Sequence, residues 1–145
     1  MEWMLLPYKR YADFSGRSRR KEYWMFFLLV FIVYIIFAAL MLGGMPFAAM
    51  EMAAETGVEP TPPGPLFWLG TIGLVIFALG TFIPALAVQV RRFHDQDKSG
   101  WFVLLNFIPY IGGIVVLVFM CIDGTRGANR FGPDPKDPAS ADVFA

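Results

Sequence analysis

Residues 23–45 read YWMFFLLVFIVYIIFAALMLGGM and contain no Asp, Glu, Lys or Arg. An α-helix rises about 1.5 Å per residue, so about 20 apolar residues cross a hydrocarbon core of roughly 30 Å. We therefore predict a transmembrane helix over this stretch. The stretch is also about twice as long as the apolar region of a cleavable signal peptide, which favours an uncleaved signal anchor.

Two further uncharged stretches follow, over residues 60–90 and 101–122. Of the 145 residues, 57 % are apolar and 17 % are charged, whereas an average chain is roughly 45–50 % apolar and about 25 % charged. A soluble protein of this length has too few residues to bury three such stretches. The sequence predicts an all-α integral membrane helical bundle, a single membrane domain over residues 1–145, with three transmembrane segments and a short N-terminal interfacial helix.

Breaks in the apolar pattern divide the chain. Residues 59–65 contain four prolines and cannot be helical, because proline removes an amide donor and excludes the α conformation from the residue before it. Residues 47–56 can form a helix beyond the membrane. The predicted order is a basic and aromatic lead 1–22, a span 23–45, an outside loop 46–65, a span 66–90, a connector 91–100, a third apolar segment 101–122 and an irregular tail 123–145.

The third apolar segment has two interpretations, because Pro109 and Gly113 bound an interruption near its middle. It is either a kinked span or a pair of half-length helices that form a re-entrant hairpin. A re-entrant hairpin is tolerated in a bilayer only where its backbone is buried against protein.

The distribution of positive charge predicts the orientation. Lys and Arg near the membrane favour the cytoplasm; the lead carries six, the connector carries three and the 46–65 loop carries none. We expect a multi-pass protein with a cytoplasmic N-terminus, an outside loop and a cytoplasmic connector. Three full spans would place the tail outside, whereas a re-entrant third segment would place all twelve cations in the cytoplasm.

The lead is rich in arginine where the first span begins. Arg17, Arg19 and Arg20 follow Gly16. One interpretation is that these cations reach lipid phosphates and fix the topology. The other is a defined anion site, in which helix N-terminal amides and arginines grip a phosphate.

The connector carries a second polar group, Arg91, Arg92, His94 and Asp95. If the second helix extends this far, Arg91 shares a face with His94 and Asp95. The group is then an ion-pair cluster that ends the helix, a site for a lipid headgroup or another anionic ligand, or a catalytic pair with His94 as the base. Catalysis is the weakest of these, since adjacent helical residues do not face one another. One His and a distant Cys121 give no metal site of a known type.

Three polar clusters carry a family resemblance. They are FSGRSRRKEYW at 14–24, RRFHDQDKSGW at 91–101 and DGTRGANRFGPDP at 123–135. In this order and spacing they resemble the bacterial membrane-protein family called domain of unknown function 805, over roughly residues 12–135. The resemblance implies a small inner-membrane protein without an assigned activity.

The tail cluster is predicted to fold back, with its glycines in turns. In that arrangement Asp123 or Asp134 pairs with the Arg17–Arg20 segment, which requires a cytoplasmic tail.

The leading functional hypothesis is a non-catalytic protein that binds anionic lipid headgroups or a protein partner at its cytoplasmic face. The alternatives are a subunit of an oligomeric channel or transporter, and an interfacial enzyme acting on lipid phosphates through His94 and Asp95. The spans contain no Asp, Glu, Lys, Arg or His, which argues against a pump acting alone. We expect no cofactor, no metal and no nucleic acid. The sequence is compatible with a protein partner or with a homo-oligomer.

Overall fold

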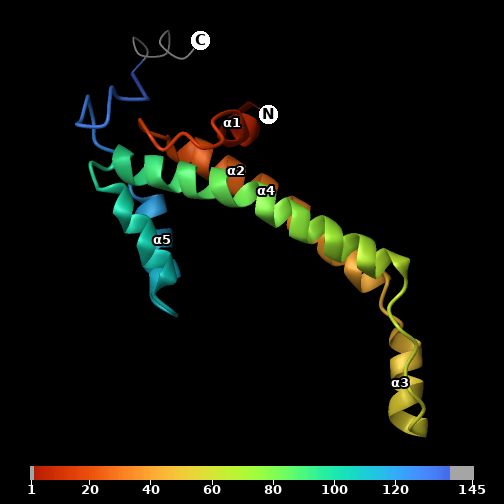
Figure 1. Ribbon diagram of the computed structural model, residues 1–145. Helices are drawn as coiled ribbons and strands as arrows, with labels where there is room; N and C mark the ends of the chain where they lie inside the picture. The colour runs from red at the N-terminus through yellow and green to blue at the C-terminus, as the bar shows by residue number, and fades with distance from the viewer. Residues whose placement is uncertain (1, 138–145) are drawn as a thin grey trace. The chain divides into compact units, whose positions relative to one another are not determined.

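The computed structural model describes residues 2–137, and the regular elements in that part of the chain are all helices (Figure 1). The predicted all-α fold class is confirmed. In chain order the helices are α1 (Glu2–Lys9), α2 (Arg20–Gly43), α3 (Phe47–Thr56), α4 (Pro65–Asp95), the 3₁₀ helix η1 (Gly100–Phe107) and α5 (Gly112–Cys121).

Helices α2 and α4 have the length and surface of membrane spans. They contain 24 and 31 residues, and at about 1.5 Å per residue each exceeds a hydrocarbon core of roughly 30 Å. In their most apolar windows only 6 % of α2 and 22 % of α4 is buried inside the protein. Core helices of a soluble protein would be mostly buried, so these apolar surfaces match a lipid environment.

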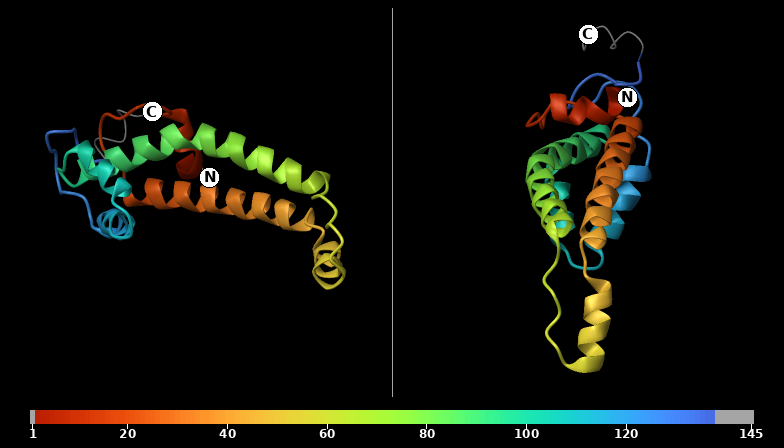
Figure 2. Two further views of the ribbon diagram at one scale, coloured as in Figure 1. Left: turned by 60° about the horizontal axis from the view of Figure 1, so that its bottom comes forward. Right: turned by 90° about the vertical axis from the view of Figure 1, so that its right-hand side faces the viewer.

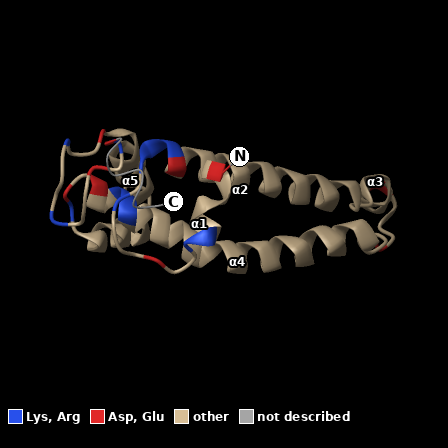
Figure 3. Ribbon diagram, turned by 90° about the horizontal axis from the view of Figure 1, so that it is seen from above, with Lys and Arg blue, Asp and Glu red and all other residues tan. Residues whose placement is uncertain are grey.

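The chain divides into two compact units. The first combines the residues up to Leu29 with those from Thr81 onward, and the second is Val30–Gly80. All twelve Lys and Arg belong to the first unit, whereas the charged residues of the second unit are Glu51, Glu55 and Glu59. In Figure 3 the ribbon of α3 carries no blue.

In the second unit, α2 and α4 lie side by side (Figure 2) and approach closely at glycines. A β-carbon added at Gly70 would lie 2.8 Å from Met41 Cγ, and one added at Gly73 would overlap the Phe37 ring. Small residues allow such packing in lipid, where helices associate by van der Waals contact. The third glycine that punctuates α4, Gly80, has open space beside it.

Helix α3 occupies the residues that the sequence allowed to be helical beyond the first span. Gly57 ends it in the left-handed conformation, with φ 72° and its N–H donating to the Ala53 carbonyl. Glycine adopts this conformation without strain, which is why it commonly follows a helix. The proline-rich stretch after it contains no helix until α4 begins at Pro65.

The third apolar segment is broken into η1 and α5. Their 8 and 10 residues correspond to about 16 and 15 Å, roughly half of the hydrocarbon core. The Ser99 hydroxyl caps η1 by accepting from the Trp101 N–H.

Both ends of this segment lie at the C-terminal end of α4. At its start, a β-carbon on Gly100 would contact Val90 and His94. At its end, Gln96 Nε2 donates to the Phe119 carbonyl at 2.6 Å. The chain therefore enters and returns at one end, which is the re-entrant alternative, and the described residues contain no third full-length span.

The first unit has its own apolar core. Phe93 from α4 packs with Val116 and Met120 from α5, all three buried, and the rings of Tyr23 and Trp24 from α2 cover them. Helix α1, the predicted short N-terminal helix, docks through Tyr8 and Thr81, whose hydroxyl oxygens lie 2.7 Å apart.

Candidate functional site

The two predicted arginine groups meet at the C-terminal end of α4. The helix runs to Asp95, so Arg91, Arg92, His94 and Asp95 all belong to its last turns. Arg91, Arg92 and Asp95 are almost completely buried, as is Arg17 from the lead.

Asp95 accepts from two of these arginines. Arg17 Nε donates to Asp95 Oδ1 at 3.0 Å, and Arg92 Nη1 donates to Asp95 Oδ2. All three side chains are at most 3 % exposed. The excess positive charge of this trio is stabilised by the negative end of the α4 helix dipole.

Arg17 also joins the lead to the tail. Its two Nη atoms donate to the carbonyls of Thr125 and Gly127, each at 2.6 Å. Arg92 reaches the tail in the same way, donating to the Ile122 carbonyl. These guanidinium groups are therefore engaged by protein acceptors.

Arg91 pairs with neither His94 nor Asp95, contrary to the shared face expected from spacing. Its Nη2 donates to Glu22 Oε1 at 3.0 Å, and both side chains are buried. Its Nη1 donates to the Asp13 carbonyl. The side chain thus faces the start of α2, and its partner there is Glu22 in the first turn of that helix.

His94 and Asp95 do not form a catalytic pair. His94 Nδ1 lies 3.2 Å from the Gly16 carbonyl, so this nitrogen carries the proton and donates, and the ring stacks on Phe131 at 3.8 Å. The Asp95 carboxylate is occupied by arginines. Within residues 2–137, no group of three or more His, Cys, Asp or Glu side chains is arranged to hold a metal ion.

The tail cluster caps α4. A helix leaves its last four carbonyls without intrahelical partners. Here the Thr125 N–H donates to the Asp95 carbonyl at 2.8 Å, and Asn129 Nδ2 donates to the His94 carbonyl at 2.9 Å. Gly124 lies so close that a β-carbon would overlap the Asp95 carboxylate. The glycine and polar residues of the tail are thus explained by capping and close approach.

Asp123 completes the link between lead and tail. Its carboxylate lies 3.0 Å from Arg20 Nη2 and 2.9 Å from Lys136 Nζ. The predicted pairing of Asp123 with the Arg17–Arg20 segment is confirmed. The hydrogen bond from Lys136 lowers the pKa of Asp123, although burial opposes the shift.

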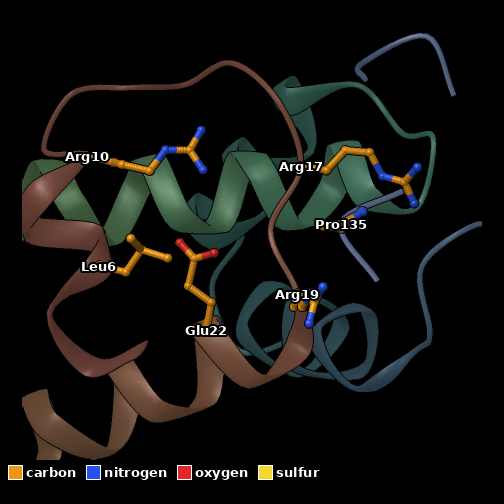
Figure 4. Close-up of a pocket in the computed structure, with 6 residues that line it drawn as sticks. All are labelled: Leu6, Arg10, Arg17, Arg19, Glu22 and Pro135. Atoms are coloured by element: carbon orange, nitrogen blue, oxygen red, sulfur yellow. The ribbon is translucent and has the colours of Figure 1, made fainter. Parts of the chain in front are cut away.

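A pocket of about 250 Å³ opens beside this network (Figure 4). Figure 4 shows the Arg17 guanidinium directed away from Leu6 and Glu22, in agreement with its bonds to the tail. The pocket is lined by Leu6, Arg10, Arg17, Arg19, Glu22 and Pro135.

Two arginines contribute charge to the pocket in different ways. Arg10 is held by Asp13, whose Oδ2 accepts from Arg10 Nε and Nη2 at 2.9 and 2.7 Å. Burial raises the pKa of Asp13, but hydrogen bonds from Ser15 and Arg10 outweigh it and lower the value to about 2. Arg19 has no carboxylate partner among the residues that the structure describes; its guanidinium lies 5.6 Å from the Trp3 ring centroid.

Comparison with known proteins places this arrangement in a family. Residues 11–133 match the family described as protein of unknown function, DUF805. The chain belongs to this family. The predicted resemblance is thereby confirmed. The DUF805 match contains the first two polar clusters and residues 123–133 of the third, and the structure joins these clusters at the end of α4.

Similar proteins are known from Escherichia coli. Inner membrane protein YhaI is 43 % identical over 136 residues, which cover 94 % of this chain and 97 % of the relative. Inner membrane protein YhaH is 42 % identical over 138 residues, covering 94 % and 98 %. No solved structure matches this chain.

Sequence reasoning missed the tail carbonyls that bind Arg17 and Arg92, because backbone acceptors leave no residue-type signal. The sequence contained only a weak indication that Glu22 pairs with Arg91, namely that Glu22 lies inside the first polar cluster of the DUF805 match.

Proposed function

We propose that this protein is a multi-pass inner-membrane protein, cytoplasmic at its N-terminus, that binds anionic phospholipid headgroups without catalysing a reaction. The ligand class is a phosphate carried by a lipid. The site is the pocket that Arg19 and Arg10 line, and Lys21 adds positive charge beside the Trp3 ring that Arg19 also contacts.

Arg19 is the observation that carries this proposal. Arg17, Arg91 and Arg92, the other predicted binding residues with buried side chains, are engaged by carboxylates and carbonyls. Among the described residues, the contact given for the Arg19 guanidinium group is with the Trp3 ring. A guanidinium group can bind phosphate through two parallel hydrogen bonds, which suits it to headgroup recognition.

The surroundings of Arg19 suit the membrane interface. Lys21 Nζ also lies 5.6 Å from the Trp3 ring centroid. Trp and long cationic side chains favour the headgroup region, where their apolar parts contact lipid and their polar ends remain solvated. Each basic residue near an anionic surface contributes roughly 1 kcal/mol of binding.

The proposed orientation rests on charge and on the returning tail. The unit that contains both the lead and the tail carries all twelve cations, and positive charge favours the cytoplasm. Arg20 Nη1 donates to the Cys121 carbonyl at 3.0 Å, which supports a tail on the same side as the lead. The names of YhaI and YhaH support the inner membrane as location.

Lipid binding is tested with Arg19→Ala and with Arg126→Ala as the control, because each removes one positive charge. Purified protein is titrated with phosphatidylglycerol or phosphatidylcholine and the bound fraction is read by native mass spectrometry. We expect several-fold preference for phosphatidylglycerol, reduced about fivefold by Arg19→Ala, the equivalent of roughly 1 kcal/mol, and retained in Arg126→Ala. Equal binding by Arg19→Ala and the unmodified protein contradicts the proposal.

Orientation is tested by cysteine accessibility in a Cys121→Ser background. Cysteines replacing Lys9 and Lys136 should both react with an impermeant maleimide only from the cytoplasmic side, and a cysteine replacing Glu55 only from the opposite side. Labelling of positions 9 and 136 from opposite sides refutes the re-entrant topology.

A further inference from the structure

The turn between η1 and α5 exposes backbone that lipid cannot satisfy. Ile108–Ile111 are non-helical, and Tyr110 has φ 65° and is 95 % exposed. The Tyr110 N–H has no acceptor among the described residues. In a bilayer, irregular backbone is tolerated only where protein buries it or where it lines a water-filled cavity.

The lengths of η1 and α5 set how deep this turn would lie in a bilayer. The segment starts and ends beside the last turns of α4, and each half extends about 15 Å, half of a core of roughly 30 Å. The turn is therefore placed near the bilayer centre. An aromatic residue at positive φ is also strained, and such strain persists only where the surroundings fix it.

A second polar group lies next to the turn. Asn106 Nδ2 donates to Gln89 Oε1 at 2.6 Å and to the Val103 carbonyl at 2.8 Å, which uses both of its hydrogens. Its Oδ1 has no partner in the described part of the chain, and the side chain is exposed. The turn thus presents an unpaired acceptor at Asn106 and unpaired donors at Tyr110.

Neither lipid nor water can supply the missing partners. Lipid tails offer no hydrogen bonds. Water is disfavoured because the exposed neighbours of the turn are apolar: Phe107 is 74 % exposed, and Ile111 and Ile114 are each 64 % exposed. Protein must therefore cover this face.

We propose that a second copy of this chain covers it, forming a two-fold dimer through the re-entrant turn. A two-fold axis brings the same patch of both copies together, and this patch carries both a free acceptor and free donors, so it is self-complementary. Phe107, Tyr110 and the isoleucines at 108, 111 and 114 offer on the order of 600 Å² per copy, close to the roughly 800 Å² per partner of a standard interface. The dimer is independent of the proposed lipid site.

Cross-linking tests the dimer in membranes. In a Cys121→Ser background, Tyr110→Cys and Ile111→Cys should give disulfide-linked dimers when oxidised with copper phenanthroline. Leu79→Cys is the control, because Leu79 is also apolar and 70 % exposed on α4 but lies outside the proposed interface. Equal cross-linking at Leu79 would show random collision and overturn the proposal, as would linkage of position 110 to a different protein.

The mass of the unmodified protein gives an independent measurement. Native mass spectrometry in a mild detergent should show twice the 16.3 kDa chain mass. Tyr110→Ala should weaken the dimer about tenfold or more, as expected for a central aromatic residue. A monomer at every concentration, with no cross-link at 110 or 111, refutes the dimer whether or not headgroup binding is found.

Discussion

The Asp95 carboxylate lies between the guanidinium groups of Arg17 and Arg92 and has almost no exposure to solvent. Asp95→Asn keeps the size of the side chain but removes its charge, which leaves two buried cations without a counter-charge. Breaking a buried ion pair by removing one partner destabilises a protein by about 3–5 kcal/mol, because the remaining charge stays desolvated. We expect a loss in this range for Asp95→Asn.

Asp97 provides a matched control for the same substitution two residues away. It pairs with Arg130 at 3.1 Å, but their side chains are 48 % and 59 % exposed. Exposed pairs contribute about 0–1 kcal/mol, so Asp97→Asn should change stability little.

Unfolding in mixed micelles, followed by tryptophan fluorescence during titration with SDS, gives the free energy of unfolding of each variant. In a thermal scan the Asp95→Asn loss corresponds to a fall in Tm on the order of 10 °C. If the free energies of unfolding of the two variants differ by less than about 0.5 kcal/mol, the buried guanidinium groups of Arg17 and Arg92 do not require the Asp95 charge. In that case the network does not hold the three polar clusters together.

Two further outcomes follow from the same region. Gly124→Ala should lower the free energy of unfolding by about 1–3 kcal/mol in the same SDS titration, because the added β-carbon would overlap the Asp95 carboxylate. Gly113 has open space around it, so Gly113→Ala should be neutral or slightly stabilising. Equal effects of the two substitutions would show that the tail does not lie against Asp95. Asp13 has a folded pKa of about 2 against 3.8 for the free side chain, so its contribution is fully present above about pH 4 and is lost as the pH falls through 2. Asp13→Asn should therefore flatten the dependence of Tm on pH between 4 and 2, and an unchanged profile would contradict the hydrogen bonding assigned to Asp13.

Local features of the sequence were sufficient to predict the all-α membrane class and two of the helices. The apolar runs that became α2 and α4 decide this locally, because length and absence of charge are sufficient for a helix to reside in lipid. The distribution of Lys and Arg and the break near Pro109 are local features too, and each could be recognised without knowledge of the fold.

The tertiary structure was needed to show that the third apolar segment is two half-length helices and not one continuous helix. A run of 22 apolar residues is long enough for one span or two halves, so its length does not discriminate. The contacts of Arg17 with Thr125 and Gly127, more than 100 residues away in the chain, return the tail to the lead.

The partners of the charged residues at the site also depend on the tertiary structure. The sequence placed Arg91, Arg92, His94 and Asp95 in a connector after the second span, and it suggested partners within the helix if that helix extended so far. In the structure α4 does extend to Asp95. The actual partner of Arg91 is Glu22, 69 residues away. Periodicity reports which face of a helix a residue occupies, whereas the partner of a buried charge depends on which helix ends meet, and that is a property of the folded chain.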